Sequence, residues 1–496
     1  MEENNMPIRA FPTGKREIGT AFLVLLISVA LANVLISGGF YMAFGICATA
    51  MILATTVYLL RSGRTLTLYS GTLLAISIIL ALSFGRSDDR FIKVILFFFL
   101  CLSANLGLCL LSGQNRRDPG GFTSMADAFR GAFLVALGDL VSVFAGLFAA
   151  GKSRKSSKTT GAVLLGLILA IPLVVLLVSL LCSADAAFAG LMDLLPTVPI
   201  EEAVLSLIVG LLFSTYFYCR AVSLQHGAPA APVSKRTGGI HPITVNTVLG
   251  AACFVYVVYL VSQSAYFIGG FSGILPAEFT MAEYARRGFF EMAGICTVNL
   301  LVISLSIGLC RKDPGKTSAT RLLCLFIGII TLFLCVTASA KMLLYIRSYG
   351  LTRLRVLTEL IMVFVAIATA LICIWLFAPR LPYMKAILLT ALLMGVVTAW
   401  ADVDTVVACY NVRSYQSGTL ETVDVDYLKT LSDGAVPYLA ELTEDPNPSV
   451  AAQAKLALRL REQLDGKEDL RSWNIADTIA DPITAPYGTE TAFDSN

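Results

Sequence analysis

The stretch FIKVILFFFLCLSANLGLCLL, residues 91–111, decides the fold, because Lys93 is its only ionisable side chain besides two cysteines. About 20 predominantly apolar residues are enough for one helical crossing of a bilayer. The whole chain follows the same trend: of its 496 residues, 56% are apolar and only 14% are charged, with a mean hydropathy of +0.77. A soluble domain carries about 25% charged residues. The composition therefore excludes an ordinary soluble enzyme, a disordered chain and a nucleic-acid-binding protein, and it predicts an integral membrane protein.

Ten further stretches have the length and composition of a crossing helix. They are residues 18–36, 40–60, 67–84, 161–182, 203–220, 243–267, 291–310, 321–345, 357–378 and 384–401. Lys15 and Arg16 precede the first stretch as in a signal peptide, but a second span follows almost at once, so we expect an uncleaved helix. The sequence predicts an all-α fold, a polytopic transmembrane helix bundle of about 11 spans over residues 1–401.

Residues 129–150 are apolar enough to cross, but basic residues lie on both sides of them. Arg116 and Arg117 precede the segment, the run from Lys152 to Lys158 follows it, and Asp139 lies near its middle. Basic loops prefer the cytoplasmic side, and a lone carboxylate is costly in hydrocarbon. We therefore expect an interfacial or re-entrant helix here.

The basic residues of residues 1–401 also orient the chain. With the N-terminus in the cytoplasm, the cytoplasmic side holds 21 of these 30 Lys and Arg residues, whereas the loop 183–202 opposite holds none. This asymmetry follows the positive-inside rule. Eleven spans then place the C-terminal domain outside the cytoplasm.

The chain changes character at Asp402. Residues 402–496 hold 17 Asp and Glu against 7 Lys and Arg, and residues 1–401 hold 17 against 30. The segments 424–431, 435–442 and 449–464 predict short amphipathic helices, and Asp445-Pro446-Asn447-Pro448 predicts a break before the third. We expect a small helical-hairpin domain at 402–476 and a disordered tail at 477–496.

The sequence contains no motif of a known catalytic site. The chain has no GxxxxGK[ST] or GxSxG motif, its twelve cysteines form no CxxC, and its two histidines lie far apart. We predict no catalytic residue, no cofactor and no metal site, and the balance leans against an enzyme. Isolated polar residues within spans, namely Asn33, Asn105, Asn246 and Asn299, are more often hydrogen-bonding partners between helices than ligands.

Two clusters of charged residues are candidate binding sites for an anion. In the first, Glu283, Arg287 and Glu291 share one helix face and predict a ladder of ion pairs, which leaves Tyr284 and Arg286 beside it. The second holds Lys341, Arg347, Tyr349, Arg353, Arg355 and Glu359. Its four basic residues on a predicted outer face depart from the positive-inside tendency. The structural alternative is snorkelling plus pairing of Arg355 and Lys341 with Glu359; the functional one is a basic pocket for an anionic headgroup or substrate.

A third cluster is Asp402-Val403-Asp404 with Asn411 and Arg413, where the last span meets the tail. Two carboxylates at i and i+2 do not face one way on a helix. We therefore expect solvated capping charges there rather than a cation site.

Three segments resemble a known family. They are GFSGILPAEFTMAEYARRGFFEM (270–292), YIRSYGLTRLRV (345–356) and YNVRSYQSGTLETVDVDYLKTLSDGAVPYL (410–439). They are similar to the bacterial multi-pass membrane proteins grouped as domain of unknown function 4153/4173. The resemblance covers the second half of the chain best, and it implies an integral membrane protein of the bacterial envelope without implying a reaction.

Three functions are compatible with these features. The first is a binding or regulatory protein of the cell envelope, with the outer basic clusters holding an anionic lipid or precursor and the helical domain meeting a protein partner. The second is a transporter or channel for a small solute, which needs more ionisable residues along the spans than are present. The third is a lipid-modifying transferase with Glu359 or Glu283 as a base. In each case the bilayer is the chain's main partner, and nucleic acid is not expected.

Overall fold

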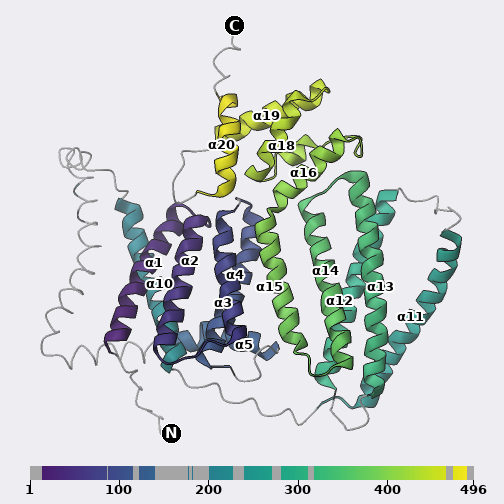
Figure 1. The fold of residues 1–496 in the computed structure, drawn as a ribbon, viewed down its shortest axis with the longest axis horizontal. Helices are drawn as coiled ribbons and strands as arrows, with labels where there is room; N and C mark the ends of the chain where they lie inside the picture. Colours follow the sequence, from purple (N-terminus) through teal and green to yellow (C-terminus); the bar gives the residue numbers. More distant parts are fainter. Residues whose placement is uncertain are drawn as a thin grey trace. The chain divides into compact units, whose positions relative to one another are not determined.

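A computed structural model describes residues 14–86, 88–115, 122–139, 200–226, 239–270, 281–310, 318–464 and 473–488, together with residues 177 and 181. Over these residues the fold is all-α, with one isolated bridge between Ile240 and Cys310 and no strand (Figure 1). The chain divides into two compact units, residues 1–232 with 465–478, and residues 233–464 with 479–496. The predicted boundary at residue 401 falls inside the second unit.

The first unit is built on five long helices. They are α1 (Lys15–Ser37), α2 (Met42–Arg61), α3 (Leu68–Leu82), α4 (Arg90–Ser112) and α10 (Ile200–His226). The helices α1 and α10 pack along each other over their length, and both ends are fixed by polar contacts. Ser37 Oγ donates to Glu202 Oε2 at 2.8 Å, and His226 Nε2 lies 3.7 Å from Glu17 Oε1. These contacts show that α10 is antiparallel to α1.

The start of the segment 129–150 lies within this unit. It contains the end of α5 (Phe122–Arg130), a π-helical turn (Gly131–Val135) and α6 (Ala136–Gly138); residues 140–150 lie outside the described residues. The buried Arg220 of α10 donates to the Gly131 carbonyl at 2.5 Å and to Asn105 Oδ1 at 3.2 Å. Arg220 thus connects the π-helical turn and α4 with α10. The prediction of an interfacial or re-entrant helix stays a prediction.

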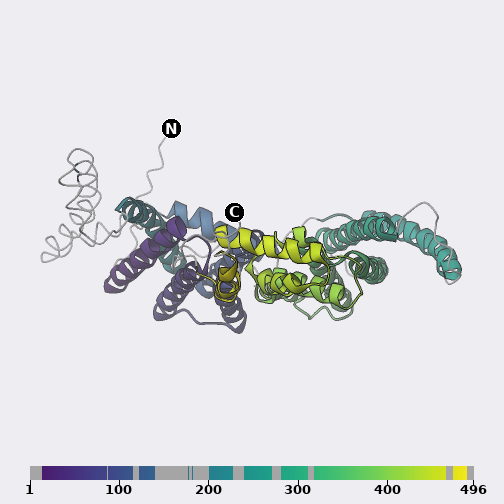
Figure 2. The same ribbon diagram turned by 90° about the horizontal axis from the view of Figure 1, so that it is seen from above.

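The second unit contains five long helices and a group of short ones. The long helices are α11 (Pro242–Gly270), α12 (Met281–Leu309), α13 (Ser318–Tyr349), α14 (Arg353–Phe377) and α15 (Tyr383–Ala401). In Figure 1, α12 to α15 run side by side, whereas α11 diverges from them toward its C-terminal end. Figure 2 looks along most of these helices and shows α11 obliquely. A core of buried side chains joins α12, α13 and α14, centred on Phe289, Leu334, Met342 and Met362. Beyond the end of α15 follow α16 (Val403–Gln416), α17 (Val425–Leu428), α18 (Val436–Glu441) and α19 (Pro448–Leu464).

Ten of the described helices are long and apolar enough to cross a membrane, and they coincide with ten of the eleven predicted spans. The eleventh, residues 161–182, lies outside the described residues apart from 177 and 181. The chain is therefore an all-α polytopic membrane protein. Its helix surfaces agree with this, since large apolar side chains such as Phe98, Phe254 and Val336 are exposed along the spans.

The four intramembrane asparagines bond between helices, as predicted. Asn33 donates to Ser206, Asn105 accepts from Arg220, Thr320 donates to Asn246, and Asn299 donates to Thr331. Each bond joins two different spans, where an unpaired amide would be costly. Tyr256 also donates to Asn299.

The C-terminal part differs from the prediction at two places. The helix α16 was not predicted, and α20 (Ile475–Gly488) covers residues 477–488, which we predicted to be disordered. That prediction is wrong for those residues. Asn474 Oδ1 accepts the amides of Ala476 and Asp477 and so caps the helix, which contains Pro482 and Pro486.

Candidate functional site

The turn between α13 and α14 carries most of the second predicted cluster, and its geometry is fixed by two caps. Gly350 follows the last residue of α13 with a φ of +74°, the left-handed conformation that ends many helices. Thr352 precedes α14, and its Oγ1 accepts the backbone amide of Arg355 at 3.4 Å. The turn is therefore short, and it presents Arg353 and Arg355 in the first turn of α14.

Arg353 forms a bidentate ion pair with Asp404 of α16. Its Nε donates to Oδ1 and its Nη2 to Oδ2, and the Asp404 side chain is fully buried while that of Arg353 is 28% exposed. The amide of Ser432 donates to the same carboxylate at 2.6 Å. Parallel N–H···O bonds of this kind fix orientation as well as charge. The expectation that Asp404 is a solvated capping charge is wrong, because its carboxylate is buried and pairs with Arg353.

Asn411 makes a second contact between the turn and α16. Its Oδ1 accepts the Leu351 amide at 2.6 Å, and its Nδ2 donates to the Leu351 carbonyl at 2.9 Å. The Asn411 side chain thus forms hydrogen bonds with both backbone groups of Leu351, as a neighbouring β-strand would. Gly350 is needed beside it, since a Cβ at that position would lie 2.7 Å from Asn411 Oδ1.

Further contacts connect the short helices with the turn and with one another. Tyr427 Oη accepts the Arg353 amide at 2.9 Å. Asp402, buried and in the left-handed region at a φ of 49°, accepts from Thr405 at 2.7 Å. Arg461 of α19 donates to Asp433 at 2.9 Å. We call residues 403–464 the helical domain, and the contacts of Arg353 and Leu351 with Asp404, Asn411 and Tyr427 the latch. The latch fixes the helical domain to the α13–α14 turn.

Arg355 caps α13 instead of pairing with Glu359. Its Nη1 donates to the carbonyls of Tyr349, at 3.0 Å, and Gly350. Its guanidinium lies 4.1 Å from the centre of the Tyr345 ring, which is in turn 5.4 Å from the Tyr349 ring. A cation at a helix C-terminus and over an aromatic ring is stabilised by both. Arg347 and Tyr349 are exposed at this end of α13 and remain able to contact a ligand.

Lys341 and Glu359 lie deeper, between the long helices. A Cβ on Gly288 of α12 would lie 2.7 Å from Lys341 Nζ, so the ammonium lies against the α12 backbone. The Oε2 of Glu359 is buried without a hydrogen bond from any described residue. The predicted pairing of Glu359 with Arg355 is not what the described contacts show, and an ionisable group at such a depth is a candidate functional group.

The first predicted cluster is only partly described. Glu283, Tyr284, Arg286 and Arg287 lie in the first turns of α12, and their side chains fall outside the described residues. Glu291 is exposed one turn further along the same helix. The ion-pair ladder and the anion site at Arg286 therefore stay predictions. No three His, Cys, Asp or Glu side chains of the described ranges converge as metal ligands would.

The latch gives the helical domain a pH dependence. Burial raises the pKa of Tyr427 above its ordinary value of 10, although the Arg353 amide hydrogen bond opposes this. Because the folded pKa is the higher one, the contribution is complete below pH 10 and is lost as the pH rises further. We expect the helical domain to loosen as the pH rises above 10, measured by hydrogen exchange. In Tyr427→Phe this rise in exchange at high pH should be absent, although the helical domain of the variant is less stable at every pH. The same rise in the variant as in the wild type would contradict the role of Tyr427.

A family model matches most of the chain. The model of the family described as "Domain of unknown function (DUF4153)" matches residues 47–442, which include α13, the latch and the helical domain up to α18. No curated protein and no solved structure matches the chain. The matched range covers most of the 496 residues and every residue of the latch. The chain belongs to the DUF4153 family of multi-pass membrane proteins.

Proposed function

We propose that this protein is a binding or regulatory protein of the bacterial cell envelope. In this proposal the exposed end of α13, with Arg347 and Tyr349, binds an anionic lipid headgroup or envelope precursor. Through the latch, a change in the α13–α14 turn on ligand binding alters the helical domain. The helical domain in turn binds a protein partner. The observation that carries the proposal is the buried Asp404–Arg353 pair, because it joins a membrane hairpin directly to an extramembrane domain.

The basic residues that take no part in the latch or the α13 cap support an anionic ligand. The latch and the cap use Arg353 and Arg355, whereas Arg347 is exposed at the end of α13. Tyrosine and arginine at a membrane surface suit the headgroup level, where each basic residue contributes about 1 kcal/mol toward an anionic lipid.

The arrangement of the first unit supports the proposed topology. Gln114, just after α4, donates to the Ser223 carbonyl near the end of α10, and Arg64, just after α2, donates to the Gln225 carbonyl. The C-terminal ends of α4 and α10 therefore lie at the same end of the helix bundle. Since α10 begins at the opposite end of the bundle, this supports an odd number of crossings between Gln114 and Ile200, as eleven spans require. We propose a cytoplasmic N-terminus and an extracytoplasmic helical domain.

Arg347→Gln tests the binding proposal. We expect the purified full chain to retain phosphatidylglycerol about fivefold less well in native mass spectrometry, the effect of one headgroup contact. Lys429→Gln, an exposed basic residue of the helical domain that pairs with Asp426, is the charge-matched control and should change nothing. Arg353→Ala is unsuitable as a first test because it breaks the latch. Equal retention by Arg347→Gln and the wild type would refute the proposal.

A further inference from the structure

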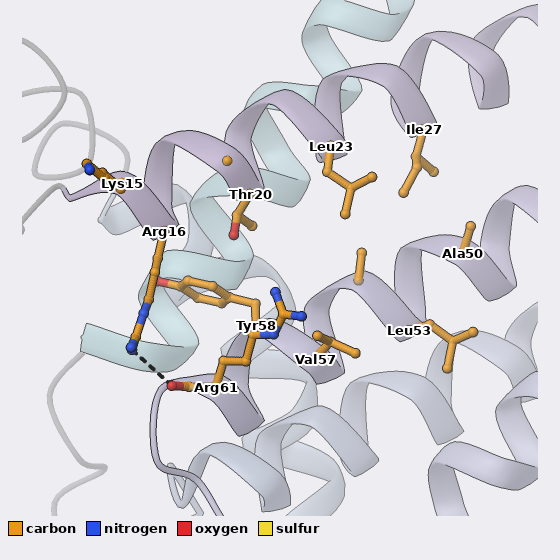
Figure 3. A pocket seen from close by; sticks show the side chains of 12 residues that line it. Lys15, Arg16, Thr20, Leu23, Ile27, Ala50, Leu53, Val57, Tyr58 and Arg61 are labelled. Atoms are coloured by element: carbon orange, nitrogen blue, oxygen red, sulfur yellow. Dashed lines mark hydrogen bonds between the residues drawn. The ribbon is translucent and has the colours of Figure 1, made fainter.

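The first unit contains a second polar feature that the proposed function does not use, a groove between α1 and α2. Its volume is about 780 Å³. Its length is lined by apolar side chains of both helices, among them Leu23, Ile27, Leu53 and Val57. Figure 3 shows these side chains pointing into the space between the two helices.

The mouth of the groove is cationic. Lys15 and Arg16 at the start of α1 and Arg61 at the end of α2 line this end, and none of the described lining residues is acidic. Arg16 Nη1 donates to the Arg61 carbonyl at 3.0 Å (Figure 3), which holds its guanidinium at the mouth. The nearby Glu17 is not among the lining residues; it accepts the Gly14 amide at 2.8 Å and lies beside His226.

A buried hydroxyl without a partner lies at the same end. Tyr58 lines the groove and is only 4% exposed, and its Oη has no hydrogen bond with any residue that the structure describes. In Figure 3 the Tyr58 ring extends from α2 toward the side chain of Arg16, and in this view its hydroxyl overlaps the α10 ribbon. A buried hydroxyl that is left unpaired is costly, so native structures normally supply a partner. A phosphate or ester oxygen entering from the mouth would be such a partner.

We propose that the α1–α2 groove binds one anionic phospholipid. The acyl chain lies along the apolar lining, the phosphate lies among Lys15, Arg16 and Arg61, and Tyr58 donates to a headgroup oxygen. A lipid fits better than a free anion because the cations lie at the end of an apolar channel about two helical turns long, from Thr20 to Ile27. By the predicted topology this lipid belongs to the cytoplasmic leaflet. The site shares no residue with the one proposed at Arg347.

Native mass spectrometry of the purified, delipidated full chain tests this site. Phosphatidylglycerol and phosphatidylcholine of equal chain length are added separately, and inorganic phosphate is added in a third arm. We expect preferential retention of phosphatidylglycerol, which Arg61→Gln lowers about fivefold and Arg16→Gln with Arg61→Gln lowers further. The Arg16–Arg61 hydrogen bond survives Arg61→Gln because it uses the backbone carbonyl. Arg380→Gln, exposed at the start of α15, is the charge-matched control and should behave as the wild type.

Tyr58→Phe separates binding from folding. The hydroxyl has no partner in the described protein, so its removal should leave the thermal midpoint of the lipid-free chain unchanged while phosphatidylglycerol retention falls severalfold. Three results would overturn the proposal. They are equal retention of both lipids, undiminished retention in both Arg61→Gln and Tyr58→Phe, and displacement of the lipid by millimolar inorganic phosphate.

Discussion

Asp404→Asn is expected to release the helical domain from the α13–α14 turn. The substitution leaves the Arg353 guanidinium facing a neutral amide in a site where the carboxylate is fully buried. Removing one partner of a buried ion pair costs about 3 kcal/mol or more. Amides of α16 should then exchange with deuterium about 150-fold faster in the full chain, since 1.36 kcal/mol is a factor of ten.

Asp426→Asn is the matched control for this prediction. Asp426 also pairs with a cation of the same domain, Lys429, but its side chain is 75% exposed. Exposed ion pairs contribute about 0–1 kcal/mol. Exchange in α16 should therefore change by less than about fivefold. If both variants behaved alike, the burial of Asp404 would have no energetic consequence and the latch would not hold the domain.

Gly350→Ala is expected to open the same latch from the other side. The residue has a φ of +74°, and a Cβ would lie 2.7 Å from Asn411 Oδ1, the acceptor of the Leu351 amide. The left-handed backbone alone costs an alanine about 1 kcal/mol. Displacing Asn411 adds about 1–3 kcal/mol, because two backbone groups lose their partner. The helical domain should lose about 3 kcal/mol of stability against opening, measured by hydrogen exchange.

Gly418→Ala separates the two causes. Gly418 has a similar φ of +72°, and a Cβ there would meet nothing within 4 Å. Gly418→Ala should therefore lower stability only by the cost of holding an alanine in the left-handed conformation, about 1 kcal/mol. The difference between the two variants measures the contact with Asn411. An equal effect of both would mean that the Asn411 contact contributes nothing.

The long helices could be predicted from the sequence because a span is a local property. Length and composition alone place a helix such as α4 to within a residue or two of its observed bounds, Arg90–Ser112 against the predicted 91–111. The intramembrane asparagines were predictable for a similar reason, since an amide in hydrocarbon must find a partner on a neighbouring helix.

The latch could not be predicted in the same way because its partners are far apart in the chain. Arg353 and Asp404 are 51 residues apart, and Asn411 and Leu351 are 60 apart. A local argument from the spacing of Asp402 and Asp404 describes an isolated helix, whereas Asp402 lies at a left-handed break between two helices. One local signal was available: Gly350 before Leu351-Thr352 marks a helix end followed by an N-cap. It would have placed Arg353 and Arg355 in the first turn of α14.

The central claim is that the helical domain and the α13–α14 turn form one structural element. Hydrogen exchange of the full chain tests it most directly, with residues 350–356 and residues 403–464 followed together in the wild type and in Asp404→Asn. The latch predicts that both segments gain exchange in parallel, because the contacts of Arg353 and Leu351 are lost with those of α16. Faster exchange confined to the helical domain, with residues 350–356 as protected as in the wild type, would contradict it.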